Sequence, residues 1–315
     1  MKIVILDQKT VTKGDISLKP IEDLGDVVSY DLSGEEDIVE KIDDAEIVLC
    51  NKVSIREDVI NKCKNLRYIG VFATGYNNID LEAARNKGIV VCNAPSYSTD
   101  AVAQHTFAFI LHFMNNVAIY NQSVQEGNWI NSQTFSYFTY PISELAGMTL
   151  GIIGFGNIGR KVAKIARVFG MEVLVYTRTK KNVDGIKFVS EEELFKRSDI
   201  LSIHCPLTED TRNFVNKDKL KLMKSSAIII NTARGPIINE QDLADALNCE
   251  RILGAGLDVL SREPMREDNP LKSAKNCVIT PHIGWAPKQA RERLIGIVAD
   301  NIKHFIDGDP VNVVN

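Results

Sequence analysis

A glycine-rich loop between a predicted strand and a predicted helix constrains the fold more than any other feature. In residues 149–170, TLGIIGFGNIGRKVAKIARVFG, the glycines Gly154, Gly156 and Gly159 stand in G-x-G-x-x-G order. An apolar run precedes the loop and good helix formers follow it, which is the context that makes the pattern credible. In this interpretation Gly154 permits the tight turn, Gly156 lets the backbone approach a pyrophosphate, and Gly159 lets the helix pack closely on the strand. The alternative is a plain strand-to-helix turn.

Short apolar runs alternate with amphipathic stretches along the chain, which is typical of parallel sheets covered by helices. The first series of expected strands is 2–6, 46–50, 66–71 and 89–93. The second series is more regular, with expected strands at 149–154, 172–176, 199–204, 227–231, 254–259 and 276–280. Six strands with intervening helices predict a doubly wound dinucleotide-binding domain. Helices are also expected over 99–117 and 291–306, and the polar, aromatic stretch 125–141 reads as a loop or excursion.

The composition fits a globular protein. The 315 residues suggest about two domains. The net charge of −4 gives no indication of a nucleic-acid or membrane-surface partner. The N-terminus reaches a charge at Asp7, too early for a signal peptide, and no apolar run is long enough for a membrane span. The six scattered cysteines have no C-x-x-C spacing, so reduced core thiols in a cytoplasmic protein are expected, with zinc binding as the alternative.

Three side chains follow three strands of the second series. Arg234 lies in NTARGP, Glu263 in LDVLSREP and His282 in TPHIGW. Taken singly, each has a structural explanation, as a surface cation, a loop acid and a core histidine. Ligands of doubly wound sheets bind outside the carboxyl ends of the strands, where the glycine loop also lies. The sequence therefore predicts that all four features face one crevice.

Together these side chains suit hydride transfer to a 2-oxo acid. A guanidinium binds the substrate carboxylate in a forked geometry. A histidine can donate the proton to the oxygen that becomes a hydroxyl. A carboxylate can orient the imidazole and stabilise its charged form. Arg234, Glu263 and His282 fill these three roles, and the remaining histidines are assigned to packing or structural hydrogen bonds.

The segments GFGNIG, NTARGP, GAGLDVLSREP and TPHIGW resemble the D-isomer-specific 2-hydroxyacid dehydrogenases. FATGYNNIDLEAARNKGI and DAVAQHTFAFIL are similar to the glycerate dehydrogenase (hydroxypyruvate and glyoxylate reductase) branch. The resemblance covers nearly the whole chain. It implies an α/β fold of two doubly wound parallel-sheet domains, a Rossmann domain (99–287) inserted in a flavodoxin-like substrate domain (1–98 and 288–315). It also implies a site that forms between the domains, with closure excluding water.

The resemblance implies further site residues. For the substrate they are Asn51, Lys52, Val53, Thr74, Gly75 and Tyr76, together with Arg234 and His282. For the cofactor they are Thr74, Val102, Gly154, Gly156, Asn157, Ile158, Gly159, Thr177, Arg178, Thr179, Cys205, Thr232, Ala233, Asp258 and Gly284. In the family the position of Asp258 serves the nicotinamide amide.

The stretch after the second strand bears on the choice between NAD and NADP. A carboxylate usually stands there and binds the ribose hydroxyls of NAD. This chain has Thr177, 177 − 154 = 23 residues past the first glycine, followed by Arg178, Thr179, Lys180 and Lys181. A neutral residue beside cations favours the 2′-phosphate of NADP. The alternative is a solvated basic turn in an enzyme that uses NAD.

The expected activity is reduction of hydroxypyruvate or glyoxylate. The alternatives are a D-lactate-type dehydrogenase for another 2-oxo acid and a dinucleotide-sensing corepressor of the same fold. A formate-type enzyme fits less well, because that branch has Gln at the position of Glu263. Phe135, Tyr137, Phe138 and Tyr140 make the excursion too apolar for water, so a homodimer is expected, as in the family. The alternative is that these rings pack on their own subunit.

Overall fold

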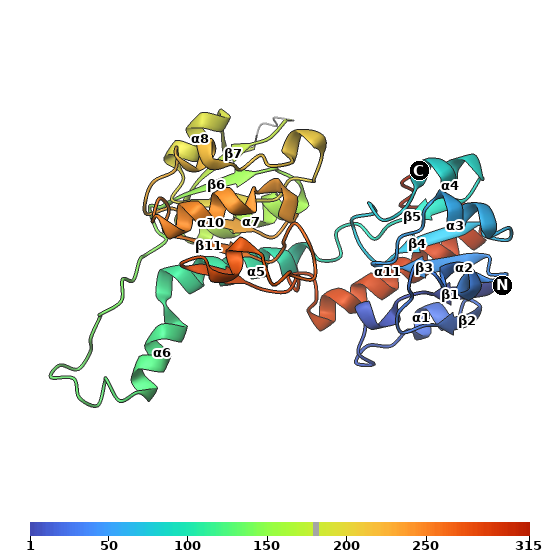
Figure 1. The fold of residues 1–315 in the computed structure, drawn as a ribbon, viewed down its shortest axis with the longest axis horizontal. Helices are drawn as coiled ribbons and strands as arrows, with labels where there is room; N and C mark the ends of the chain where they lie inside the picture. Colours follow the sequence, from blue (N-terminus) through green and yellow to red (C-terminus); the bar gives the residue numbers. More distant parts are fainter. Residues whose placement is uncertain (179–182) are drawn as a thin grey trace. The chain divides into compact units, whose positions relative to one another are not determined.

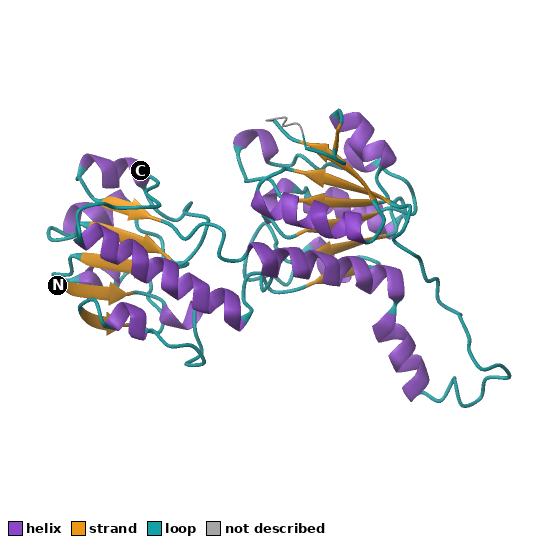
Figure 2. Ribbon diagram, turned by 180° about the vertical axis from the view of Figure 1, so that it is seen from behind, coloured by secondary structure: helices purple, strands orange, loops and turns teal. Residues whose placement is uncertain are grey.

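The chain forms two compact units in the computed structural model, which describes residues 1–178 and 183–315 (Figure 1). Unit 1 consists of Met1–Ser98 and Trp285–Asn315, and unit 2 is Thr99–Gly284. Each unit is a parallel sheet with helices packed against it, and Figure 2 shows the helices in purple lying against the orange strands. The predicted class, two parallel-sheet α/β domains, is confirmed.

The described sheet of unit 1 has the strand order β2-β1-β3-β4-β5, and all its pairs are parallel. This is the flavodoxin-like order 2-1-3-4-5. The central strands β3 and β4 are buried on both faces, which explains their continuous apolar runs. The strands are β1 (Lys2–Ile5), β2 (Asp26–Ser29), β3 (Ile47–Cys50), β4 (Tyr68–Val71) and β5 (Val90–Cys92).

The last helix of the chain belongs to unit 1. Helix α11 (Lys288–Ile306) packs on β4, and the ring of Phe305 lies 4.9 Å from that of Tyr68, centroid to centroid. The shorter helices of this unit are η1 (Gln8–Thr10), α1 (Lys19–Glu22), α2 (Ile38–Ile42), α3 (Glu57–Lys62) and α4 (Leu81–Asn86).

The described sheet of unit 2 has the order β12-β11-β10-β9-β6-β7-β8, again with parallel pairs. The crossover between β6 and β9 gives the 3-2-1-4-5-6 arrangement of dinucleotide-binding domains, extended by one strand. The carboxyl ends of these strands share one edge. The strands are β6 (Thr149–Ile153), β7 (Glu172–Tyr176), β8 (Lys187–Phe188), β9 (Ile200–Ile203), β10 (Ile228–Asn231), β11 (Gly254–Leu257) and β12 (Cys277–Ile279).

Helices cover both faces of this sheet, because alternate side chains of a strand point to opposite sides. Leu150 and Ile152 of β6 join a cluster with α5 and α7, whereas Ile153 joins a cluster on the other face with α8 and α10. The helices are α5 (Thr99–Asn115), α6 (Val117–Gln125), α7 (Asn157–Val168), α8 (Glu191–Arg197), η2 (Glu209–Thr211), α9 (Lys217–Leu220), η3 (Gly235–Ile237), α10 (Glu240–Asn248) and η4 (Pro270–Ser273).

The helix predicted over 99–117 ends two residues early. Asn116 has a left-handed backbone (φ 51°), a conformation that asparagine tolerates better than most residues, and α6 begins directly after it. Helix α6 and residues 126–148 form an arm that projects from the sheet of unit 2 (Figures 1 and 2). No helix in the described parts of the chain is long and apolar enough to cross a membrane.

Candidate active site

The glycine loop has the geometry of a phosphate cradle. Gly154 has φ +92°, and a Cβ there would lie 2.6 Å from the backbone nitrogen of Cys205. A Cβ on Gly159 would lie 2.3 Å from the carbonyl oxygen of Gly154, so helix α7 rests directly on the turn. A Cβ on Gly156 would meet nothing within 4 Å. The residues therefore fit a pyrophosphate, which can approach the exposed backbone at Gly156.

Helix α7 adds a favourable electrostatic environment. Its N-cap residue is Gly156, which has no side chain to cap the helix, and its first turn holds no acidic residue. The first N–H groups of a helix have no partner within the helix and carry a partial positive charge. An anion at this end would receive hydrogen bonds from them.

Thr177 and Arg178 directly follow β7, at the same edge of the sheet as the glycine loop. Thr177 is half-buried and Arg178 is exposed. Burial raises the pKa of the Cys205 thiol to about 11, and the positive charge of Arg178 acts in the opposite direction. Within residues 1–178 and 183–315, no carboxylate forms an ion pair with Arg178. The predicted cofactor residue Thr179, with Lys180 and Lys181, lies outside the described residues.

The loop that carries Arg234 is fixed at both ends. Buried Asn231 accepts a hydrogen bond from the amide of Ala233 (3.0 Å) and donates one to the carbonyl of Arg234 (3.0 Å). A Cβ on Gly235 would lie 1.9 Å from the carbonyl carbon of Leu260. The 232–235 loop therefore lies directly against the loop that leads to Glu263, and only glycine allows this approach.

His282 and Glu263 form a hydrogen-bonded pair. The Nδ1 of His282 lies 2.7 Å from Oε2 of Glu263, and Oε1 of the same carboxylate accepts the amide of Leu260 at 3.0 Å. The side chains are 27% and 37% exposed, so both can be reached from solvent. An ionised carboxylate only accepts hydrogen bonds, so Nδ1 carries a proton and Nε2 is left as the exchangeable nitrogen.

The backbone of His282 is also unusual. Its φ is +54°, a left-handed conformation that is costly for a residue with a side chain and is often found at functional sites. The amide N–H of His282 donates to the carbonyls of Asp258 and Thr280, both at 2.9 Å. These bonds hold the turn on which the imidazole sits.

Asp258 is the buried centre of the same turn. Its Oδ1 accepts the hydroxyl of Thr280 (2.6 Å) and the amide of Ile283 (2.8 Å), and its Oδ2 accepts the amide of Gly284 (2.8 Å). Burial acts to raise the pKa of Asp258, but hydrogen bonds from His105, Thr280 and the two amides outweigh it and lower that pKa. The carboxylate is therefore kept ionised, and Oδ2 retains capacity to accept a further donor.

Unit 1 holds the other predicted substrate residues. The amides of Asn51, Lys52 and Val53 all donate to the buried carboxylate of Asp7, at 2.8, 2.6 and 3.2 Å. Their N–H groups therefore already have a partner, a role for Asp7 that the sequence pattern did not reveal. Thr74 donates its hydroxyl to the carbonyl of Ala94. Contacts of Thr74, Gly75 and Tyr76 with substrate stay predictions.

The remaining predicted cofactor residues belong to unit 2. Val102 is buried in α5, Ile158 is half-buried in the first turn of α7, and Thr232 lies 3.3 Å from Thr106, hydroxyl to hydroxyl. Their roles in a cofactor site stay predictions.

The other four histidines have different surroundings. His204 bonds the hydroxyl of Ser202 (2.8 Å), and burial lowers its pKa to about 3, so it stays neutral. His112 packs edge-on against Phe113, and His304 is exposed. His105, which we expected only to pack, also has a polar partner, because its Nε2 lies 2.9 Å from the hydroxyl of Thr280.

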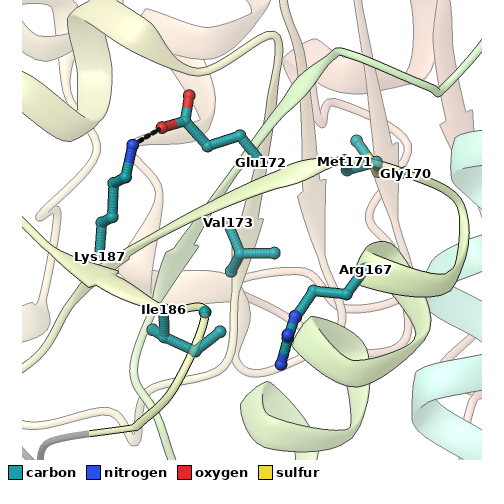
Figure 3. Close-up of a pocket in the computed structure, with 8 residues that line it drawn as sticks. Arg167, Gly170, Met171, Glu172, Val173, Ile186 and Lys187 are labelled. Atoms are coloured by element: carbon teal, nitrogen blue, oxygen red, sulfur yellow. Dashed lines mark hydrogen bonds and ion pairs between the residues drawn. The ribbon is translucent and has the colours of Figure 1, made fainter.

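A cavity of about 480 Å³ lies elsewhere on unit 2. It is formed at the start of β7, near Glu172, whereas Thr177 and the glycine loop stand at the opposite edge of the sheet. Figure 3 shows Lys187 paired with Glu172 on one side of it and Arg167 on another. This cavity is separate from the candidate site. Among the described residues, no group of three or more His, Cys, Asp or Glu side chains is placed to hold a metal ion.

Comparison with known proteins agrees with this geometry. The model of the D-isomer specific 2-hydroxyacid dehydrogenase NAD-binding domain matches residues 107–284. The chain is 45% identical to a hydroxypyruvate reductase of Blautia hydrogenotrophica, with all of both chains covered. It is 38% identical to a glycerate dehydrogenase of Methylorubrum extorquens, with 99% and 98% covered. Among solved structures, an acyclic imino acid reductase in complex with NADPH and D-Arg matches with TM-score 0.90, 34% identity and full coverage of both chains.

Proposed function

The chain belongs to the family of D-isomer-specific 2-hydroxyacid dehydrogenases, and we propose that it reduces hydroxypyruvate to D-glycerate or glyoxylate to glycolate, reversibly. The observation that carries the proposal is the 2.7 Å hydrogen bond between His282 and Glu263 beside the loop of Arg234. Relatives that match over 99% or more of the chain are named hydroxypyruvate reductase and glycerate dehydrogenase, and glyoxylate reductases match over 82% to 89% of it. Because those relatives are enzymes, the alternative of a dinucleotide-sensing corepressor gains no support.

Each of the three side chains has one role in the proposed mechanism. When bound, the reduced nicotinamide supplies the hydride that is added to the carbonyl carbon. Arg234 binds the substrate carboxylate through its forked guanidinium and so orients the molecule. Nε2 of His282 donates its proton to the carbonyl oxygen, which becomes the hydroxyl, and recovers it in the reverse direction. Glu263 holds Nδ1 and stabilises the imidazolium before the transfer.

Unit 2 is proposed to bind the cofactor, in agreement with the domain model that it matches. The backbone at Gly156 and the N-terminus of α7 would hold the pyrophosphate. Oδ2 of Asp258, which can accept a further hydrogen bond, would accept one from the nicotinamide amide. Thr177 and Arg178 favour NADP over NAD, and the structure of the imino acid reductase contains NADPH. Unit 1 is proposed as the substrate domain.

A steady-state panel tests the substrate assignment. Hydroxypyruvate, glyoxylate, pyruvate and phenylpyruvate are each reduced with NADPH and with NADH, and kcat/KM is compared. We expect one of the first two acids to give the highest value. A preference for phenylpyruvate, or reduction of pyruvate alone, would instead indicate a D-lactate-type enzyme with a larger or different pocket.

Arg234→Lys should raise the KM for the oxo acid by about tenfold or more. A lysine keeps the charge but cannot reproduce two parallel hydrogen bonds to a carboxylate. The KM for the cofactor should stay close to the wild-type value. Arg85→Lys, an exposed arginine on α4, is the matched control. An unchanged KM for the oxo acid in Arg234→Lys would remove this residue from the substrate site.

A homodimer is proposed, and the arm of unit 2 is its expected interface. Phe135 and Phe138 are 92% and 81% exposed. By contrast, Tyr137 donates its hydroxyl to Ser123 of α6, and the ring of Tyr140 packs edge-on against Tyr120 of the same helix. Two of the four aromatic rings thus remain uncovered, a feature that favours a protein partner.

Light scattering at micromolar concentration should therefore give twice the 35.0 kDa mass of the chain. Replacing Phe135 and Phe138 together by serine should lower that mass towards the monomer. Leu32→Ser, an exposed apolar residue of unit 1, is the control and should leave it unchanged. A wild-type monomer would refute the dimer.

A further inference from the structure

Helix α5 lies unusually close to the strand that leads to Asp258. A Cβ added to Gly256 of β11 would lie 2.8 Å from the ring of Phe109. The ring of His105, one turn earlier on α5, packs edge-on against Phe109 with a centroid distance of 4.8 Å. This packing brings His105 to the turn that follows β12, although 175 residues separate it from Thr280.

The donor and acceptor chemistry fixes the direction of the hydrogen bonds. The hydroxyl of Thr280 donates its one proton to the carboxylate of Asp258 at 2.6 Å. Its oxygen can then only accept from His105, so Nε2 of His105 carries the proton in the 2.9 Å contact. The same nitrogen lies 3.4 Å from Oδ1 of Asp258. His105 therefore donates into a chain that ends on a buried anion, and such chains strengthen each bond in turn.

The two acceptors of this chain are also the two backbone anchors of His282. Its amide donates to the carbonyls of Asp258 and Thr280. The carboxylate of Asp258 holds the amides of Ile283 and Gly284 on the other side of the histidine. A rotation of the Asp258 side chain would therefore disturb the backbone beside His282, which already has a left-handed φ of +54°, and the hydroxyl of Thr280 restrains that side chain.

The neighbouring residue on α5 reaches the other loop of the site. Thr106 donates its hydroxyl proton to the carbonyl of Val102, so in its 3.3 Å contact Thr232 is the donor. Thr232 starts the loop that carries Arg234. Adjacent residues of one helix thus contact the two loops that hold His282 and Arg234.

We propose that His105 is a positioning residue for the reaction: acting through Thr280 and Asp258, it fixes the turn that presents His282. The inference rests on the proposed function, because it concerns the efficiency of proton transfer by His282. His105 itself has no contact with the reacting atoms in this role. A displacement of about 1 Å in a catalytic group can cost up to about 100-fold in rate, so a lost anchor is expected to appear in kcat.

The test is a double-mutant cycle on the full-length enzyme with hydroxypyruvate and the preferred cofactor. His105→Leu removes the donor, and Thr280→Val removes the hydroxyl at nearly constant volume. Each single variant should lower kcat about tenfold. The kcat of the double variant should be no lower than that of the less active single variant, because both substitutions break the same hydrogen bond. His105→Gln retains a donor of similar reach and should recover kcat to within about threefold of the wild-type value.

His112→Leu is the matched control, since it removes a histidine of the same helix whose ring packs on Phe113. Thermal unfolding of every variant is measured in parallel. If His105 had a purely structural role, its loss would lower the melting temperature, and the effects of the two substitutions on kcat would be independent. Wild-type kcat in His105→Leu, or multiplicative losses in the double variant, would overturn the proposal. If His105→Leu does not fold, wild-type kcat in Thr280→Val overturns it equally.

Failure of the inference is distinguishable from failure of the proposed function. If His282→Ala is inactive while His105→Leu has normal kcat, only the positioning role is wrong. If His282→Ala is itself fully active, the catalytic assignment is wrong and the cycle has no bearing on it.

Discussion

Replacing His282 with alanine should lower kcat by about 10²- to 10⁴-fold, the usual contribution of a general acid–base group. The variant loses the Nε2 proton donor and leaves Glu263 without the partner that it holds at 2.7 Å. Initial rates of reduced-cofactor oxidation at saturating hydroxypyruvate measure the effect. Binding of the cofactor alone, followed by its fluorescence, should change little, because the glycine loop and α7 are untouched.

His304→Ala is the matched control for this variant, since His304 is exposed on the last helix. It should retain wild-type activity. Near-normal reduction of hydroxypyruvate by His282→Ala would remove the histidine from the chemistry, whatever the outcome for Arg234 or Glu263.

The wild-type enzyme should prefer NADPH, and the combined change Thr177→Asp and Arg178→Ala should shift that preference towards NADH by about ten- to a hundredfold in kcat/KM. Aspartate would accept the ribose hydroxyls of NADH and repel a 2′-phosphate. Removal of Arg178 takes away a cation that has no carboxylate partner in the described part of the chain. The measurement is the ratio of the two kcat/KM values with one oxo acid.

Lys164→Ala, an exposed cation on α7, is the control and should leave this ratio unchanged. The single variant Thr177→Asp measures repulsion of the 2′-phosphate, and the single variant Arg178→Ala measures loss of the cation that would bind it. A wild-type enzyme with higher kcat/KM for NADH than for NADPH would show that Thr177 and Arg178 do not recognise the 2′-phosphate of NADPH.

The strands that the sequence predicted most clearly are the central ones, which are buried on both faces, whereas the edge strand β12 was predicted although it is half-buried. Residues 149–153, 200–203 and 228–231 are continuous apolar runs, and the structure buries nearly every residue in them. Two edge strands were missed, β2 and β8, because DVVS and KF contain at most two consecutive apolar residues. The break between α5 and α6 was missed because one left-handed asparagine leaves the apolar spacing of the helix unchanged.

The candidate site was predictable where a residue follows a strand. Arg234, Glu263 and His282 each come after a strand of one parallel sheet, and topology alone then brings their loops to one edge. The contact between His282 and Glu263 agrees with the roles given to them. Their catalytic roles stay predictions, which the variants above test, and the domain assignments stay predictions as well.

The supporting residues could not be predicted in the same way. Asp7 bonds to the 51–53 loop across more than 40 residues, and His105 meets Thr280 across 175. Periodicity and motifs describe neighbours in sequence, whereas these pairs depend on which helix packs on which strand. In the sequence, Asn231 and Thr280 look like ordinary polar residues at strand ends. Only their hydrogen bonds, to the carbonyl of Arg234 and to the carboxylate of Asp258, show that they support the site.

The most direct test of the whole account is reduction of hydroxypyruvate by the purified wild-type protein, followed by loss of reduced-nicotinamide absorbance and by chiral analysis of the product. We predict rapid oxidation of NADPH with one D-glycerate formed for each NADPH consumed. Absence of oxidation with hydroxypyruvate and glyoxylate, with either cofactor, would contradict the assignment, and so would formation of L-glycerate.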